Sequence, residues 1–267
     1  MYKSINPYIK CPAGEALEIF PTRLGPRIAT LTEPEVDVMR KAVASALLLF
    51  LLSCPASDLR AADVKEPFGM DKTAAPETSS TWQEWKKVIA AADVEIQKLE
   101  KCRAEKNCNL AENKYSAIVK EARPKEPYPK VDFVQVRINH EIQYVADYTQ
   151  WGKADRWSLP VDGEGKGSLN TGIGDCEDYV LAKYLVLLDA LYPYKSMRIL
   201  LVRDNFVRQD HAVLAVNHEG KWLILDNRWD RLYEDQHLKQ FKPLMAVDAD
   251  GVHYLNKMFR IADSYDP

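Results

Sequence analysis

Three residues in the second half of the chain have the types and the order of a nucleophile, its base and an orienting acid. Cys176 follows the turn Gly172-Ile173-Gly174-Asp175 and opens a strongly apolar stretch that is typical of a buried helix. A thiol at a helix N-terminus lies near the positive end of the helix dipole, which favours the thiolate. His211 begins one apolar run and Asp226 ends another. On neighbouring antiparallel strands, Asp226 can orient the imidazole while His211 takes the thiol proton.

Each of these residues also has an ordinary structural explanation. A cysteine at the start of an apolar helix is often an inert core residue, and a histidine beside a strand is often simply held by hydrogen bonds. Asp226-Asn227 can be only a turn. Short motifs taken singly are weak evidence. Their occurrence together, in the order Cys, His, Asp and each at an element boundary, favours a cysteine nucleophile that forms a covalent acyl intermediate.

The flanking sequence predicts the elements that must position these residues. Apolar residues at helical spacing predict a helix from cap candidates at 78–80 to about 99, then helices over 110–122 and 131–147, with prolines 124, 127 and 129 breaking the chain before the last. A long ordered loop is expected over 148–175, and a central buried helix over 176–191. Strands are expected at 197–202, 211–216, 222–225 and 253–261, as an antiparallel meander. The predicted fold class is α/β of the α+β kind.

The first sixty residues have the layout of an export signal. An uncharged run over 42–53 follows Arg40-Lys41 and precedes a polar, small-residue stretch, and it is short for a membrane span. Cleavage after Ala61 is favoured, and lipidation of Cys54 is the alternative. Met39 then is the expected initiator, which makes 1–38 a misassigned leader and 39–61 the signal peptide. A flexible segment is expected over 62–77, and one domain over 78–267, in the periplasm.

The cysteine count supports this division. Without residues 1–61, the chain keeps Cys102, Cys108 and Cys176. Cys102 and Cys108 lie close together between two helical patterns, and in an oxidising compartment we expect a disulfide there. A metal site would need two further ligands that nothing nearby supplies. Cys176 is then an unpaired thiol in an exported protein, which needs a functional explanation.

Composition narrows the class of protein. The 267 residues are 46% hydrophobic and 28% charged, which is typical of a globular protein rather than a disordered or fibrous one. A net charge of −3 argues against a general nucleic-acid binder, although local basic patches stay open.

Several motifs together resemble those of the bacterial transglutaminase-like cysteine peptidases, a papain-like group that includes periplasmic proteases releasing surface adhesins. They are GDCEDYVLAKY (174–184), DHAVLAV (210–216) and LILDN (223–227), and the resemblance extends upstream through 139–144 and ADRWSLP (154–160). The resemblance covers most of residues 80–230. It implies N-terminal helices, a central helix bearing the nucleophile Cys176, and an antiparallel sheet bearing the base His211 and the orienting Asp226.

The resemblance also implies a ligand and partners. The adhesin-cleaving branch binds Ca²⁺ with an acidic pair that corresponds to Asp175 and Glu177, whose ordinary role is to compensate the helix N-terminus. The chemistry itself requires no cofactor. A protein substrate and a monomer are expected. An adhesin substrate follows only from the better-known branch, and a regulatory partner at the membrane leaves no trace in the sequence.

Two questions stay open at the level of sequence. The Cys176 backbone N–H is the natural first oxyanion donor, with Asn170 and Trp157 as candidates for the second, and Trp157 can equally pack beneath its loop. The same triad can also pass the acyl group to an amine, as a transglutaminase does, and a binding module can keep the peptidase fold without activity.

Overall fold

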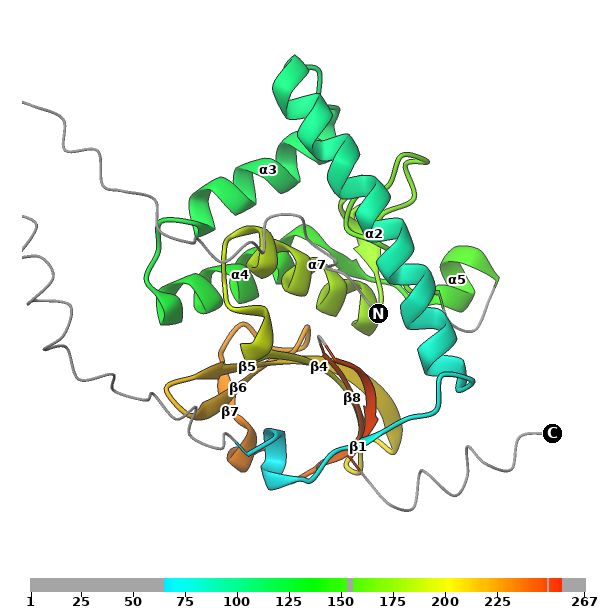
Figure 1. Ribbon diagram of the computed structural model, residues 1–267, viewed down its shortest axis with the longest axis vertical. Helices are drawn as coiled ribbons and strands as arrows, with labels where there is room; N and C mark the ends of the chain where they lie inside the picture. Colours follow the sequence, from blue (N-terminus) through cyan, green and yellow to red (C-terminus); the bar gives the residue numbers. More distant parts are fainter. Residues whose placement is uncertain (1–64, 153–155, 249, 256–267) are drawn as a thin grey trace, which may run out of the picture. The chain divides into compact units, whose positions relative to one another are not determined.

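A layer of helices covers one face of a curved antiparallel sheet (Figure 1). The computed structural model describes residues 65–152, 156–248 and 250–255. The longer helices of the described ranges are α2 (Ser80–Glu105), α3 (Leu110–Ala122), α4 (Pro127–Glu141) and α7 (Cys176–Asp189). Capping residues and turns in the sequence set their bounds. The predicted α+β architecture is confirmed. The proposed leader and signal, residues 1–61, lie outside the described residues.

Helices α2 and α3 begin at side-chain caps. The Ser79 hydroxyl accepts from the backbone N–H of Trp82 at the start of α2. At the start of α3, Asn109 and Glu112 cap each other's backbone N–H groups reciprocally. The predicted bounds of α3 agree with the structure, whereas α2 runs six residues beyond the expected end at 99. A disulfide joins Cys102, in the last turn of α2, to Cys108 just before α3.

The third helix starts and ends earlier than predicted. Pro127 is the first residue of α4, where its missing N–H costs nothing and its fixed φ suits the helix. The prolines that were expected only to break the chain therefore also start this helix. At the other end, residues after Glu141 leave the helix because Gln143–Tyr144 form the short strand β2, which pairs in parallel with β3 (Ile173–Gly174).

The stretch expected as a long ordered loop contains short regular pieces. Helix α5 (Asp147–Trp151) follows β2, and helix α6 (Ser168–Thr171) precedes β3. The β2–β3 pair joins the two ends of this stretch, since the Gln143 N–H donates to the Gly172 carbonyl over 2.8 Å and the Val145 N–H donates to the Gly174 carbonyl over 2.9 Å. The segment before Cys176 is thereby held in place.

The seven-stranded sheet has the order β1-β9-β8-β4-β5-β6-β7. The bounds of its strands are β1 Thr73–Ala74, β4 Met197–Asp204, β5 Gln209–His218, β6 Lys221–Leu225, β7 Tyr233–Glu234, β8 Phe241–Asp248 and β9 Gly251–Tyr254. The expected meander holds for β4, β5 and β6, whereas β7 and β8 were not predicted. The strand expected at 253–261 corresponds to β9, which begins earlier, at Gly251, and residues 256–261 lie outside the described residues. Strand β8 pairs with β4, and β9 pairs with β8. The chain therefore returns from β7, at one edge of the meander, to the β4 edge on the opposite side.

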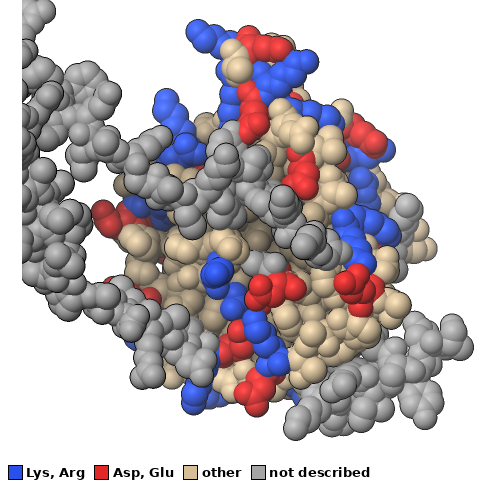
Figure 2. Space-filling model, viewed as in Figure 1, with Lys and Arg blue, Asp and Glu red and all other residues tan. Residues whose placement is uncertain are grey.

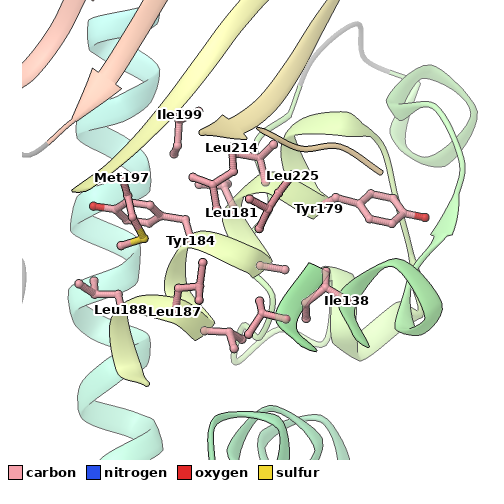
Figure 3. Packing of buried hydrophobic residues seen from close by; sticks show 14 of the residues in the cluster. Ile138, Tyr179, Leu181, Tyr184, Leu187, Leu188, Met197, Ile199, Leu214 and Leu225 are labelled. Carbon is pink, nitrogen blue, oxygen red and sulfur yellow. The ribbon is translucent and has the colours of Figure 1, made fainter. Parts of the chain in front are cut away.

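Alternating side chains of the sheet form two apolar layers. Met197, Ile199, Leu214 and Leu225 face the helices and pack against Leu181, Leu187 and Leu188 of α7 (Figure 3). Leu200, Val213 and Ile224 point to the other face, where they meet Trp222, Leu238 and Phe241. Helix α7 is buried along most of its length, between the sheet and α4, as its apolar sequence predicts. The residue at its first position is thus fixed relative to the sheet.

Residues 65–77 contact the sheet, although a flexible segment was expected there. Strand β1 pairs with β9, and the Trp222 indole N–H donates to the Lys65 carbonyl over 2.7 Å. Two ion pairs add to this: Lys72 with Asp248 at 2.9 Å and Arg198 with Glu66 at 2.9 Å. This segment therefore closes over the face of the sheet that the helices leave open.

The charged side chains do not gather by sign on the face that Figure 2 shows. Lysine, arginine, aspartate and glutamate side chains alternate there over α2 and its surroundings. Among the helices of the described residues, none is both long and apolar enough to cross a bilayer.

Candidate active site

A tight turn places Cys176 at the first position of α7. Gly172 adopts the left-handed conformation, with φ +74°, and ends α6. Gly174 must lack a side chain, because a Cβ there would lie 2.8 Å from the Asp178 side chain, which folds back over it. One Asp178 oxygen accepts from the Asp175 N–H over 3.3 Å, and the other accepts from the Ser158 N–H over 2.8 Å. The turn and the helix start therefore hold each other in place.

The Cys176 sulfur lies against strand β5. It accepts a hydrogen bond from the backbone N–H of Ala212, the residue that follows His211. The thiol in turn donates to Glu177 Oε2 over 3.2 Å. Burial, together with the Glu177 carboxylate, raises the pKa of the Cys176 thiol, against the effect expected from the helix dipole. In the absence of a compensating charge, desolvation and the neighbouring acids outweigh the helix N-terminus.

His211 and Asp226 meet across two neighbouring strands. His211 lies near the start of β5, and Asp226 directly follows β6, which pairs antiparallel with β5. The His211 Nε2 atom lies 3.0 Å from Asp226 Oδ1. Burial opposes ionisation of Asp226, but hydrogen bonds from His211 and Arg228 lower the pKa of its carboxyl to about 2. A carboxylate that is ionised at neutral pH therefore faces Nε2, which leaves Nδ1 as the ring nitrogen for other partners.

Two side chains of α4 hold the backbone around Asp226 by hydrogen bonds. The Gln135 amide donates to the Asp226 carbonyl over 2.8 Å, and the Asn139 amide donates to the Trp229 carbonyl over 2.9 Å. Gln135 is fully buried. Lys183 of α7 is also fully buried and without a hydrogen-bond partner, and burial lowers the pKa of its ammonium to about 7. Neither Gln135 nor Lys183 stands out in the sequence, because each occupies an otherwise ordinary helical pattern.

A third carboxylate joins the two predicted cation ligands. Ligand oxygens of Asp147, Asp175 and Glu177 lie within 4.8 Å of one another. The Asp175 carboxylate also accepts from the Asp147 N–H over 3.1 Å. Burial and the nearby Asp175 raise the pKa of Glu177 to about 10. A cluster of hard oxygen donors whose charges repel each other fits a divalent cation such as Ca²⁺. Asp147 was missed because nothing in its local sequence links it to residues 175–177.

Comparison with known proteins identifies the family of this chain. The model of the family Peptidase_C93, described as bacterial transglutaminase-like cysteine proteinase BTLCP, matches residues 88–239. This chain belongs to that family. It is a cysteine peptidase with a transglutaminase-like fold.

Two solved structures of one protein are similar to this chain, and the first of them supports its fold. Calcium-bound LapG of Legionella pneumophila is 23% identical with a TM-score of 0.50, covering 61% of this chain and 88% of that one. EGTA-treated LapG is 23% identical with a TM-score of 0.49, covering 61% and 86%. The search of curated proteins found no match.

The two oxyanion candidates of this cysteine peptidase have structural contacts. Asn170 Oδ1 accepts from the Asp162 N–H over 3.0 Å and so ties together the loop before α6. Trp157 packs against the main core. The packing alternative for Trp157 therefore fits the structure. Cys176 is the first residue of α7, directly after the N-cap Asp175. The N–H groups at the start of a helix have no acceptor within the helix, so the Cys176 N–H stays a candidate oxyanion donor.

Proposed function

We propose that this peptidase hydrolyses a peptide bond in an exported protein, with Cys176 as nucleophile, His211 as base and acid, and Asp226 as orienting group. The observation that carries the proposal is the place of the thiol. It contacts the backbone of Ala212, the residue next to His211, and the His211 ring is held through Nε2 by the buried, ionised Asp226 carboxylate. A cysteine that only packs in the core does not require a neighbouring histidine that is hydrogen-bonded to an ionised carboxylate.

The proposed reaction has two steps. His211 takes the thiol proton, and the sulfur attacks the peptide carbonyl to form a thioester while His211 protonates the leaving amine. His211 then activates a water molecule, which releases the acid and restores the thiol. Asp226 keeps the imidazole in one orientation and stabilises its protonated form in both steps. The Cys176 N–H at the start of α7 stabilises the oxyanion.

We infer that the site acts outside the cytoplasm, on a surface protein. The run at 42–53 supports export, and the Cys102–Cys108 disulfide fits an oxidising compartment. A surface adhesin is the proposed substrate, because the motifs resemble those of adhesin-releasing proteases.

An experiment on exported proteins tests the substrate and the reaction together. The purified enzyme is incubated with surface proteins stripped from cells, in the presence of a labelled primary amine, and new N-termini are sequenced. We expect new N-termini at one or a few sites in a large surface protein and no covalent amine. The matched control is enzyme alkylated at Cys176, the free cysteine of the described residues. Incorporation of the amine without new N-termini would instead establish acyl transfer.

We further propose that Asp147, Asp175 and Glu177 hold Ca²⁺. The bound cation would neutralise the carboxylates beside the thiol and tie α5 to the start of α7. The chain's own residues still perform every proton transfer.

Calcium should stabilise the fold through this cluster. Saturating Ca²⁺ is expected to raise the free energy of unfolding by about 3 kcal/mol at one hundred times its dissociation constant, seen as a higher melting temperature than in EGTA. Asp147→Asn should lose most of that shift, while Asp132→Asn, an exposed carboxylate on α4, should keep it. Equal melting temperature and equal activity in chelator and in calcium would remove the proposal.

A further inference from the structure

Arg228 connects the proposed triad to the β4–β5 turn. Its guanidinium donates to both oxygens of Asp226, over 2.8 Å from Nη2 to Oδ2 and 3.1 Å from Nε to Oδ1. Its backbone N–H also donates to Oδ1, over 2.9 Å. The third guanidinium nitrogen, Nη1, donates to Asp204 Oδ2 over 2.8 Å. One planar cation thus fixes two carboxylates at once.

Asp204 anchors the far end of this chain of contacts. It is the last residue of β4 and almost fully buried. Its second oxygen, Oδ1, accepts from the backbone N–H groups of Phe206 over 2.9 Å and Val207 over 3.4 Å. Its place is therefore set by the backbone of the β4–β5 hairpin, and His211 follows seven residues after Asp204 in the same hairpin. Arg228 therefore links the Asp226 carboxylate to the same β4–β5 hairpin that carries the His211 imidazole.

Two aromatic rings lie against the Arg228 guanidinium. The Arg228 guanidinium carbon lies 4.7 Å from the centre of the Trp229 ring and 5.3 Å from that of Phe241. Phe241 also contacts His211, with ring centres 6.1 Å apart. The Arg228 guanidinium and the His211 imidazole therefore both contact the Phe241 ring. Both hydrogen bonds and stacking restrict Arg228 to one orientation.

We propose that Arg228, braced by Asp204, is a positioning residue that holds the Asp226 carboxylate in line with His211. This inference rests on the proposed function of the triad. Without the guanidinium, the Asp226 carboxylate can rotate about its own axis, and only the His211 contact and one backbone N–H would restrain it. A misplacement of about 1 Å in such a constellation can cost on the order of 100-fold in rate. Sequence reasoning missed Arg228 because the stretch after LILDN reads as a turn.

The test must separate positioning from stability, because removing Arg228 alone leaves Asp204 buried and unpaired. We therefore pair Arg228→Gln with Asp204→Asn in one protein. The amide at 204 still accepts from the hairpin N–H groups, and Asp226 keeps its contacts with His211 and with the backbone N–H of residue 228, so this double variant should stay folded. Its kcat is expected to fall about 100-fold, with KM within about twofold. Arg228→Lys should recover little, because one ammonium cannot replace the planar fork.

The matched control is Arg203→Gln. Arg203 sits beside Asp204 in the same strand and pairs with the exposed Asp210 at 3.0 Å, outside the chain of contacts. It should keep full kcat. A folded double variant with wild-type kcat, or a loss no larger than that of Arg203→Gln, would overturn the inference.

A substrate-free measurement distinguishes this inference from the proposed function. The Nε2 proton of His211, held by Asp226, should give a protected downfield NMR signal in the wild type, absent from the double variant and present in Arg203→Gln. If the wild type cleaves nothing but the signal behaves so, the peptidase proposal fails and the positioning role stands. If the wild type cleaves and the signal survives in the double variant, the positioning role fails alone.

Discussion

Replacing Cys176 with alanine should abolish proteolysis, with a fall of at least about 10⁴-fold in kcat/KM. At roughly 1.4 kcal/mol for each factor of ten, that is more than 5 kcal/mol of transition-state stabilisation. The size follows from the proposed mechanism, because alanine cannot form the thioester and a positioned water is a far poorer nucleophile. The measurement is cleavage of the substrate identified from surface proteins, with iodoacetamide uptake as a second readout. In protein without residues 1–61, the wild type should take up one equivalent and the variant none.

The other described cysteines supply a matched control. The double variant Cys102→Ser, Cys108→Ser removes the disulfide between α2 and α3, which closes a short loop and should cost about 2 kcal/mol of stability. Because that bond lies outside the contacts of α7 with β5 and β6, kcat/KM should stay within about twofold. Unchanged cleavage by Cys176→Ala at the same peptide bond would assign the nucleophile to another group.

The sequence predicted those parts of the fold that depend on local chemistry. Helix α3 lies between its own caps, and strands β4, β5 and β6 follow from apolar runs between turns. Strand β8 was missed because Pro243 interrupts its pattern and a register shift at Leu201/Val202 of β4 accommodates it. Such an irregularity is visible only when both strands are in place.

The residues of the candidate site likewise divide into those that local sequence predicted and those that it did not. Cys176, His211 and Asp226 stand at element boundaries, where residue type and context could be read together. Asp147 and Arg228 could not be found this way, because their roles depend on contacts that other segments create. Asp147 reaches Asp175 through the parallel pairing of β2 with β3, and Arg228 reaches Asp204 across the sheet.

The electrostatics of the thiol also required the structure. A helix N-terminus alone favours a thiolate, worth a fraction of a kcal/mol to about 2 kcal/mol. Burial and Glu177 act in the opposite direction and raise the pKa of Cys176. The result explains why the acidic cluster and the nucleophile have to be considered as one unit: whatever neutralises Asp147, Asp175 and Glu177 removes a charge that opposes the thiolate.

Replacing His211 with alanine should lower kcat/KM by about 10⁴-fold, since the variant loses both the base for the thiol and the acid for the leaving amine. KM should change little, and added imidazole should restore part of the rate by entering the space of the lost ring. His218→Ala is the matched control, because His218 ends the same strand and contacts Tyr128 instead. We expect it to keep wild-type activity. If His211→Ala stays folded and cleaves as fast as His218→Ala, the base is a different residue, and the hydrogen bond between His211 and Asp226 serves only the fold.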